Sequence, residues 1–475
     1  MSENGEMERY DLCVIGGGPA GYAAAMRAID YGKRVCLVEK NKVGGAGIYD
    51  GALSSKTLWE LSERIRAVKD AVNQSGGDAE GDDRYDLRWE EVTQLLGEAI
   101  FERKFQYSCH IKILSAETDL FTYARGFGRM LSPNEIQITK DSGKSKVVWA
   151  QNIVLSTGSR PRKLPHIEVD EKTIMTSDGI HSMDDFPKSL VIVGAGVIGC
   201  EYATIFSNFG KTKVYIIDRS DRILPFEDED VVEIIAGNLE RKGVHIHKKA
   251  QLKRMEVVDG PDGQEVEYEL EKPDGTTEII RVEKALLSIG RVPNVEGIGL
   301  EEAGVSMSKR GVHIGDDDTQ TNVPNIYAVG DVSGHIQLVN MGELEARHAV
   351  ERMYGEKTTR LSYTNVSTIM FLHPAVAGVG LNEMQCMEQG IPMKVVKIDY
   401  SCIARAIAMR KTQGFFKIIV TNDDEMKILG MRAIGEHASS AIQAVALLIK
   451  MNKGIEELAE MVHPHPNIIE GIQEC

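Results

Sequence analysis

The pattern that most constrains the fold of this chain is a glycine-rich turn between an apolar strand and a helix. Its first copy, VIGGGPAGYAAAM, places Gly16, Gly18 and Gly21 after the apolar residues 12–15. Glycines at this spacing allow a tight turn and a close approach of the backbone to a pyrophosphate at the helix N-terminus. The next strand ends at Glu39, where a carboxylate can accept hydrogen bonds from ribose hydroxyls. The unit therefore predicts a βαβ fold that binds a dinucleotide.

The same unit returns in VIVGAGVIGCEYA, and its three glycines are Gly194, Gly196 and Gly199. Two dinucleotides, or one flavin and one nicotinamide, are therefore expected. Asp218 closes the strand after this second unit and favours NAD(H), because a carboxylate repels the 2′-phosphate of NADP(H). Arg219 and Arg222 follow at once and offer that phosphate a cradle, so NADP(H) stays open as the alternative.

The length and charge of the chain limit its class. With 475 residues it is too long for one hydrophobic core, and its net charge of −16 argues against nucleic acid and anionic membranes as partners. No apolar run approaches the roughly 18 residues of a membrane-spanning helix. The acidic start of the chain is unlike a signal or transit peptide, so we expect a cytoplasmic protein, or a mitochondrial one if a transit peptide was removed. Seven cysteines without C-x-x-C or C-x4-C spacing favour a reducing compartment.

Further motifs follow in the order of a known enzyme family. They are STGSRPRKLP from residue 156, SIGRVPN from 288, TNVPNIYAVGDV from 321, FLHPAVAGVGLNE from 371 and HPHPNIIE from 463. With the two glycine units, they resemble the FAD-dependent pyridine nucleotide–disulfide oxidoreductases, and among these the dihydrolipoamide dehydrogenases and the soluble pyridine nucleotide transhydrogenase. The resemblance runs from Tyr10 to about Glu470. It implies an α/β fold with two Rossmann-like dinucleotide-binding domains, for FAD and NAD, and a C-terminal α+β dimerisation domain.

The resemblance also implies domain boundaries. The FAD-binding domain takes residues 1–160 and 291–355, the NAD(P)-binding domain takes residues 161–290, and the dimerisation domain takes residues 360–475. A polar, acidic loop is expected over residues 75–86. The implied assembly is a homodimer in which each site is completed by the other subunit, and membership of a larger assembly is open.

Cofactor-binding residues are implied in the same way. Those for FAD are Gly16, Gly18, Gly21, Glu39, Lys40, Gly45, Lys56, Gly126, Thr157, Gly158, Asp331 and Leu338. Those for NAD are Gly194, Gly196, Gly199, Asp218, Arg219 and Gly290. Asp331 would lie on the flavin ribitol. No metal is expected, since His463 and His465 lack a third and a fourth ligand.

The segment VGGAGIYDGALSSK departs from the family at its redox cysteines. The family pattern is G-G-x-C-x-x-x-G-C-x-P-S-K, and this chain carries Gly47 and Ala52 at the two cysteine positions. Disulfide reductases use thiol–disulfide exchange, which needs an attacking thiolate that neither residue supplies. Cys36 and Cys200 would have to meet a partner through the fold. Cys475 has no adjacent partner and is interpreted as a frayed terminal thiol.

Four residues match the family's remaining catalytic positions. Lys56 and Glu201 match an ion pair beside flavin N5, where an ammonium stabilises negative charge on the reduced flavin. His465 and Glu470 match an acid–base dyad that the partner subunit offers to the active site. Without thiols, two roles stay open for His465: it protonates another acceptor such as a quinone, or it is only an interface residue. His373 and His463 are interpreted as packing or surface residues.

Three functions are compatible with these residues. The leading hypothesis is a flavoprotein that takes hydride from NAD(P)H onto FAD and passes electrons directly to a small acceptor, such as a second nicotinamide, a quinone, a dye-like compound or oxygen. The alternative is a non-catalytic FAD- and NAD-binding homologue with a structural or sensing role. A third hypothesis keeps disulfide chemistry, with thiols from a partner protein or from Cys475.

Overall fold

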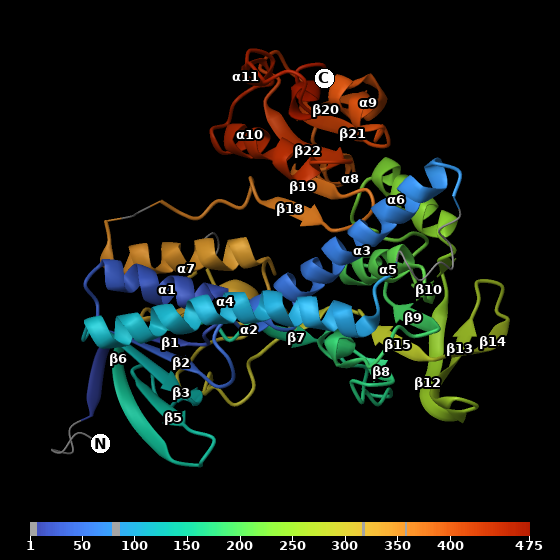
Figure 1. Ribbon diagram of the computed structural model, residues 1–475. Coiled ribbons are helices and arrows are strands. Elements are labelled where there is room, and N and C mark those ends of the chain that lie inside the picture. The colour runs from blue at the N-terminus through green and yellow to red at the C-terminus, as the bar shows by residue number, and fades with distance from the viewer. Residues whose placement is uncertain (1–6, 78–85, 316–318, 357–358) are drawn as a thin grey trace. The chain divides into compact units, whose positions relative to one another are not determined.

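The computed structural model describes residues 7–77, 86–315, 319–356 and 359–475 (Figure 1). The chain divides into two compact units. The first consists of Met1–Thr57, Glu91–Arg162 and Gly290–Leu361, and the second of Leu58–Glu90, Lys163–Ile289 and Ser362–Cys475. The acidic loop expected over residues 75–86 lies mostly outside the described residues. The domain boundaries expected from the sequence stay a prediction.

A seven-stranded sheet forms the centre of the first unit, in the order β3-β2-β1-β6-β5-β4, with β17 also paired to β6. The parallel part contains β1 (Glu8–Ile15), β2 (Val35–Glu39), β3 (Phe121–Arg125) and β17 (Ile326–Ala328). The antiparallel part contains β4 (Phe127–Met130) and β5 (Glu135–Thr139). The long strand β6 (Ser145–Leu155) belongs to both parts. A small separate sheet joins β7 (Ser159–Pro161) to β16 (Arg291–Pro293).

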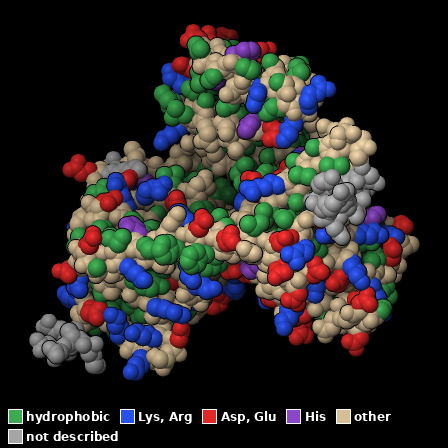
Figure 2. Space-filling view, viewed as in Figure 1, with side chains coloured by type: hydrophobic (Ala, Val, Ile, Leu, Met, Phe, Trp, Pro, Cys, Tyr) green, Lys and Arg blue, Asp and Glu red, His purple; other side chains and the backbone are tan. Residues whose placement is uncertain are grey.

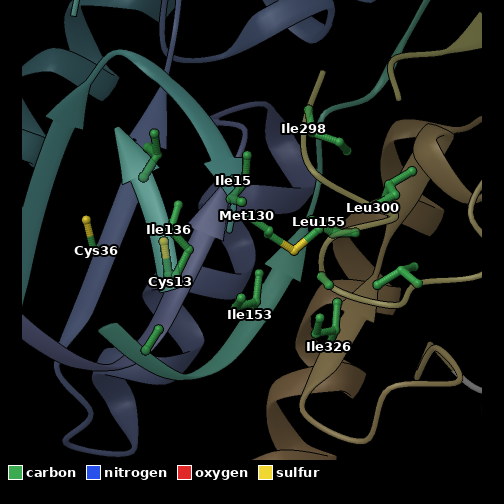
Figure 3. Close-up of a cluster of buried hydrophobic side chains, with 14 of the residues drawn as sticks. Cys13, Ile15, Cys36, Met130, Ile136, Ile153, Leu155, Ile298, Leu300 and Ile326 are labelled. Carbon is green, nitrogen blue, oxygen red and sulfur yellow. The ribbon is translucent and has the colours of Figure 1, made fainter. Parts of the chain in front are cut away.

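Strand β1 is buried on both faces. Leu12 and Val14 pack in a cluster with residues of α1 (Pro19–Asp30) and α7 (Val339–Tyr354). Cys13 and Ile15 point to the opposite face, into the cluster drawn in Figure 3. Burial on both faces explains why this strand reads as a continuous apolar run.

The second unit contains two parts with separate sheets. Its parallel sheet has the order β11-β10-β9-β15-β8, and an antiparallel sheet β12-β13-β14 follows it in the chain. The parallel strands are β8 (Ile174–Met175), β9 (Ser189–Val193), β10 (Lys213–Ile217), β11 (His245–His247) and β15 (Lys284–Leu287). The antiparallel strands are β12 (Gln251–Gly260), β13 (Gly263–Glu271) and β14 (Thr277–Val282). The helices of this part are α5 (Val197–Phe209) and α6 (Glu229–Arg241).

The C-terminal part of the second unit is a five-stranded antiparallel sheet in the order β18-β19-β22-β21-β20. Its strands are β18 (Ser367–Met370), β19 (Val376–Gly380), β20 (Met393–Asp399), β21 (Phe415–Thr421) and β22 (Ile428–Ile434). Its helices are α8 (Glu383–Glu388), α9 (Ala404–Met409), α10 (Ala438–Lys450) and α11 (Glu456–Ala459). Three further α-helices among the described residues are α2 (Gly45–Ile48), α3 (Ala52–Gln74) and α4 (Trp89–Glu117). The predicted α/β fold, with two dinucleotide-type sheets and an α+β C-terminal domain, is confirmed.

Among the described helices, none has both the length and the apolar character needed to cross a bilayer. On the face drawn in Figure 2, the Lys and Arg side chains lie intermingled with Asp and Glu.

Candidate functional site

The first glycine turn, between β1 and α1, is shaped to leave room at the helix N-terminus. A Cβ atom at Gly16 would collide with the Ser156 carbonyl, and one at Gly21 would collide with the Gly16 carbonyl. At Gly18, which precedes the first turn of α1, an added Cβ would meet nothing within 4 Å. Two of the glycines thus allow close packing, and the third leaves an open cradle at the helix N-terminus.

The second glycine turn, between β9 and α5, has the same construction. A Cβ at Gly194 would lie 2.6 Å from the Ser288 carbonyl oxygen, and one at Gly199 would collide with the Gly194 carbonyl. Gly196 precedes α5 and again has open space around the position of an added Cβ. Both cradles therefore fit the pyrophosphate of a dinucleotide.

The two predicted acids hold the two glycine turns in place. Glu39 accepts hydrogen bonds from the backbone N–H of Gly17 at 2.7 Å and of Asn41 at 2.6 Å. Asp218 accepts them from Ala195 at 2.6 Å and from Ser220 at 2.8 Å. A carboxylate has about four acceptor positions, so each acid retains capacity for ribose hydroxyls.

Two serines complete these turns, and the sequence reasoning missed them. The Ser156 hydroxyl donates to the carbonyl of Gly16 at 2.9 Å, and the Ser288 hydroxyl donates to that of Gly194 at 2.9 Å. The signal was present, because STG at residues 156–158 and SIG at 288–290 share a Ser-x-Gly pattern. The repeated pattern marks where each sheet's return strand meets its glycine turn.

Several predicted FAD residues gather around the first turn. The Gly126 N–H donates to the Glu39 carbonyl at 2.9 Å. An added Cβ at Gly45 would lie 3.4 Å from the Cα of Gly18. Lys40 is exposed beside Glu39. The structure thus brings Gly126, Gly45 and the glycine turn into one region.

A second group of predicted FAD residues lies at the ends of β6 and β17. The Thr157 hydroxyl donates to the Asn294 carbonyl at 2.6 Å, and the Gly158 carbonyl accepts from the Asn294 N–H at 2.9 Å. Asp331 accepts a hydrogen bond from the Ser159 hydroxyl at 2.6 Å. Leu338 stands directly before α7.

Two arginines follow Asp218 in the chain, and their surroundings differ. Arg219 is exposed directly after Asp218. Arg222 donates from Nη2 to the Pro225 carbonyl and to the Met384 sulfur, both at 3.2 Å. Gly290 accepts a hydrogen bond at its carbonyl from the Arg162 N–H at 2.9 Å, within the first unit.

The segment with Gly47 and Ala52 folds as the short helix α2 followed by α3. A Cβ on Gly47 would lie 2.5 Å from Cγ of Pro19, at the start of α1. Ala52 is the half-buried first residue of α3. The backbone here accommodates glycine at position 47 and leaves no space for a larger side chain without a shift of the Pro19 ring.

Lys56 and Glu201 belong to different units. Lys56 lies in α3, where its Nζ donates to the Ser55 hydroxyl at 3.3 Å. Glu201 lies in α5, is 5% exposed, and accepts a hydrogen bond from the Phe371 N–H at 3.0 Å. Their mutual ion pair stays a prediction.

The structure brings His465 and Glu470 together. Nδ1 of His465 lies 2.9 Å from Oε2 of Glu470, and the histidine side chain is 74% exposed against 16% for the glutamate. The carboxylate can therefore orient the imidazole, as predicted for an acid–base dyad.

Several thiols of the chain have raised pKa values, which makes them poor nucleophiles at neutral pH. Cys13 and Cys36 lie opposite each other on β1 and β2, both fully buried (Figure 3). A hydrogen bond with Cys36, together with burial, raises the pKa of Cys13, and burial raises that of Cys200. Burial also raises the pKa of Cys475 to about 12. The expectation of a frayed Cys475 was wrong, because this residue packs against the core of the C-terminal sheet.

Comparison with known proteins agrees with this architecture. Residues 10–346 match the family model described as pyridine nucleotide-disulphide oxidoreductase, and residues 366–475 match the dimerisation domain of the same family. A dihydrolipoyl dehydrogenase of Bacillus subtilis is 33% identical over 98% of this chain and 97% of its own length. The leghemoglobin reductase of Glycine max is 30% identical over 98% of this chain and 87% of its own.

Solved structures show the same fold. LpdA from Mycobacterium tuberculosis aligns with a TM-score of 0.86 and 24% identity over 98% of both chains. The HOCl-induced flavoprotein disulfide reductase RclA from Escherichia coli aligns with a TM-score of 0.83 and 24% identity, over 98% of this chain and 99% of its own. Family members are oxidoreductases that bind FAD and NAD(H). The chain belongs to the pyridine nucleotide-disulphide oxidoreductase family.

Proposed function

We propose that this protein is an FAD-dependent NADH oxidoreductase whose electron acceptor is a small molecule other than a disulfide. The observation that carries the proposal is the pair Gly47 and Ala52 at the positions where the family pattern has its cysteines. The tight contact of Gly47 with Pro19 supports it, because a cysteine there would need the Pro19 ring to move.

The first glycine turn, Glu39 and Asp331 would hold FAD, and the second glycine turn with Asp218 would hold the nicotinamide dinucleotide. When bound, FAD supplies the redox chemistry, since it accepts hydride from a reduced nicotinamide and releases electrons to an acceptor. The protein supplies binding, orientation and charge. We place the FAD-binding segments at residues 1–160 and 291–355, and the nicotinamide-binding domain at 161–290.

Lys56 and Glu201 are assigned an electrostatic role. The Lys56 ammonium would stabilise negative charge beside it, and the Glu201 carboxylate would hold the ammonium in place. Glu201 is itself held by the Phe371 N–H, at 3.0 Å. His465, oriented by Glu470, would hold a proton at Nε2 and deliver it to an acceptor such as a quinone.

The raised pKa values of three thiols support an electron acceptor that is reached without a sulfur relay. An attacking thiolate is required for disulfide exchange, and a high pKa keeps a thiol protonated at neutral pH. Cys13, Cys200 and Cys475 all have pKa values raised mainly by burial or by a neighbouring thiol. A role for Cys475 as a replacement redox thiol is therefore disfavoured.

NADH is the proposed coenzyme in preference to NADPH. Asp218 closes the strand after the second glycine turn, and a carboxylate there would repel the 2′-phosphate of NADPH. Arg222 is engaged by the Pro225 carbonyl and the Met384 sulfur, so it is turned to other partners. Arg219 would therefore have to compensate, without Arg222, the repulsion between Asp218 and the 2′-phosphate of NADPH.

Rapid mixing of the FAD-loaded protein with NADH, and separately with NADPH, tests the proposal. We expect NADH to bleach the flavin absorption band quickly, with no long-wavelength charge-transfer band of a thiolate, and a quinone to restore the colour. Failure of both nucleotides to bleach the flavin would favour the non-catalytic alternative. Restoration of the colour by lipoamide would contradict the proposed acceptor class.

A further inference from the structure

A polar cavity of about 260 Å³ lies within the second unit, and it is lined by none of the residues assigned to either dinucleotide. Its walls come from the second half of α3, the end of α6 and the segments before β19 and β21. Three of the lining side chains are basic, namely Arg66, Arg241 and Lys242. Only one carboxylate, Asp70, lines the cavity.

The acidic groups nearby are already engaged by Arg66. Its guanidinium contacts Glu63, with Nη2 at 2.9 Å from Oε2, and Nη1 contacts the Asp70 carboxylate. Glu63 also lies 3.3 Å from Nδ1 of His373, another residue of the cavity wall. The two carboxylates on α3 are therefore both engaged by Arg66, and Glu63 also contacts the His373 ring.

Arg241 and Lys242 contact only amide oxygens in this region. Arg241 donates to Oδ1 of Asn238, and Lys242 donates to Oδ1 of Asn208. An amide oxygen accepts a hydrogen bond but does not neutralise a charge, and neither cation forms an ion pair with a described residue. The wall at the end of α6 thus carries an excess of positive charge.

The pKa of Lys242 is set mainly by its burial and only secondly by neighbouring positive charge. Burial, followed by repulsion from Arg66, lowers the pKa of Lys242 to about 8, although Glu63 and Asp70 act in the opposite direction. A bound anion would reverse the repulsion and favour the charged lysine.

We propose that this cavity binds a phosphate group, either as free inorganic phosphate or as the end of a small phosphomonoester. Arg241 and Lys242 would donate to its oxygens. His373 and Gln413, which both accept hydrogen bonds from the Asn238 amide, would complete the lining beside them. Charge-assisted hydrogen bonds of this kind are short and strong, and a guanidinium matches two phosphate oxygens at once. The binding is independent of the proposed redox function.

Calorimetric titration of the FAD-loaded protein tests this inference at pH 7, with NAD⁺ present to fill the nucleotide cradle. One arm uses inorganic phosphate, a second uses glycerol 3-phosphate, and sodium chloride at equal ionic strength serves as the blank. We expect saturable binding of at least one phosphate compound at one site per chain. The compound that binds more tightly shows whether the site takes free phosphate or a phosphomonoester.

Substitutions locate the site. Arg241→Gln and Lys242→Gln should each weaken binding roughly tenfold or more, the effect of losing one hydrogen bond to a charged group. Lys248→Gln, an exposed lysine outside the cavity, should leave the affinity unchanged. Absence of saturable binding in the wild-type protein, or equal affinities in all variants, would overturn the inference. Arg241 is exposed, so the Arg241→Gln variant should fold and report on the site even if the Lys242 variant does not.

Discussion

The carboxylate of Glu470 lies 2.9 Å from Nδ1 of His465, next to an imidazole that is 74% exposed. A carboxylate at this nitrogen favours the tautomer with the proton on Nδ1, which leaves Nε2 as the nitrogen that takes up and delivers a proton. The pair has the geometry of a general acid held ready by its neighbour. It needs no thiol to perform that role.

Replacing His465 by Gln should separate acceptors that need a proton from those that do not. Quinone reduction consumes protons, so its kcat should fall about 100-fold, the usual contribution of a general acid. Ferricyanide takes up electrons only, so its reduction rate should change little. Steady-state assays with NADH and each acceptor make the comparison.

The matched control for this experiment is His463→Gln, which changes the neighbouring histidine of the same segment. It should leave both rates near the wild-type values. An equal loss with quinone and ferricyanide in the His465 variant would show that this residue acts only in the subunit interface.

Adding a methyl group at Gly47 should destabilise the protein. The new Cβ would lie 2.5 Å from Cγ of Pro19, and overpacking of this kind costs about 1–3 kcal/mol. Thermal unfolding of the FAD-loaded Gly47→Ala variant measures the effect, with Ala52→Ser, at a half-buried position of the same segment, as the control. A Gly47→Ala protein as stable as the wild type would show that this segment has room for a side chain at position 47.

Asp218→Asn should weaken the preference for NADH. The amide retains an acceptor for the Ala195 N–H but loses the charge that repels a 2′-phosphate. We expect the ratio of kcat/KM for NADH over NADPH to fall by roughly tenfold. Asp221→Asn, an exposed acid three residues on, is the control. An unchanged ratio in the Asp218 variant would assign the preference to other residues.

Glu63 should contribute stability that depends on pH. Burial raises its pKa, but hydrogen bonds from His373 and Arg66 outweigh this and lower it to about 2, against an ordinary value of 4.5. The unfolded chain therefore binds the proton more readily, so the stabilisation is complete above about pH 4.5 and is lost as the pH falls toward 2. A difference of this size corresponds to at most roughly 3 kcal/mol at neutral pH.

Urea unfolding of Glu63→Gln in excess FAD checks this expectation. The free energy of unfolding of the variant should be lower than that of the wild type at pH 7. This difference between the two proteins, the stability gap, should narrow between pH 5 and 3.5. Glu60→Gln, at an exposed position of the same helix, should show no such gap. A gap that stays constant with pH would mean that the charge of Glu63 does not stabilise the fold.

The two glycine turns could be predicted in detail from the sequence because each depends on local backbone geometry. Gly21 and Gly199 must lack a side chain, because a Cβ atom there would collide with a backbone carbonyl. The acid that closes the next strand lies a fixed distance along the chain. The same logic predicted Glu39 and Asp218. Their hydrogen bonds to the turn itself were not foreseen, because the family pattern assigns them to the ligand.

Contacts between distant segments could not be predicted. The segment Phe371–His373 makes three such contacts. The Phe371 N–H donates to Glu201, and the Leu372 carbonyl accepts from the Trp59 ring. The His373 ring contacts the Glu63 carboxylate. These partners lie more than 100 residues away in the chain, and no spacing rule connects them. The packing of Cys475 was missed for the same reason, since a terminal residue is usually frayed.

The most direct test of electron transfer without a sulfur relay measures turnover before and after alkylation of the cysteines that the folded protein exposes, such as Cys402. The FAD-loaded protein would be assayed with NADH and a quinone, and separately with dihydrolipoamide and NAD⁺. We predict that quinone reduction survives alkylation and that dihydrolipoamide oxidation is absent throughout. Dihydrolipoamide oxidation that is present before alkylation and abolished by it would contradict electron transfer without a sulfur relay.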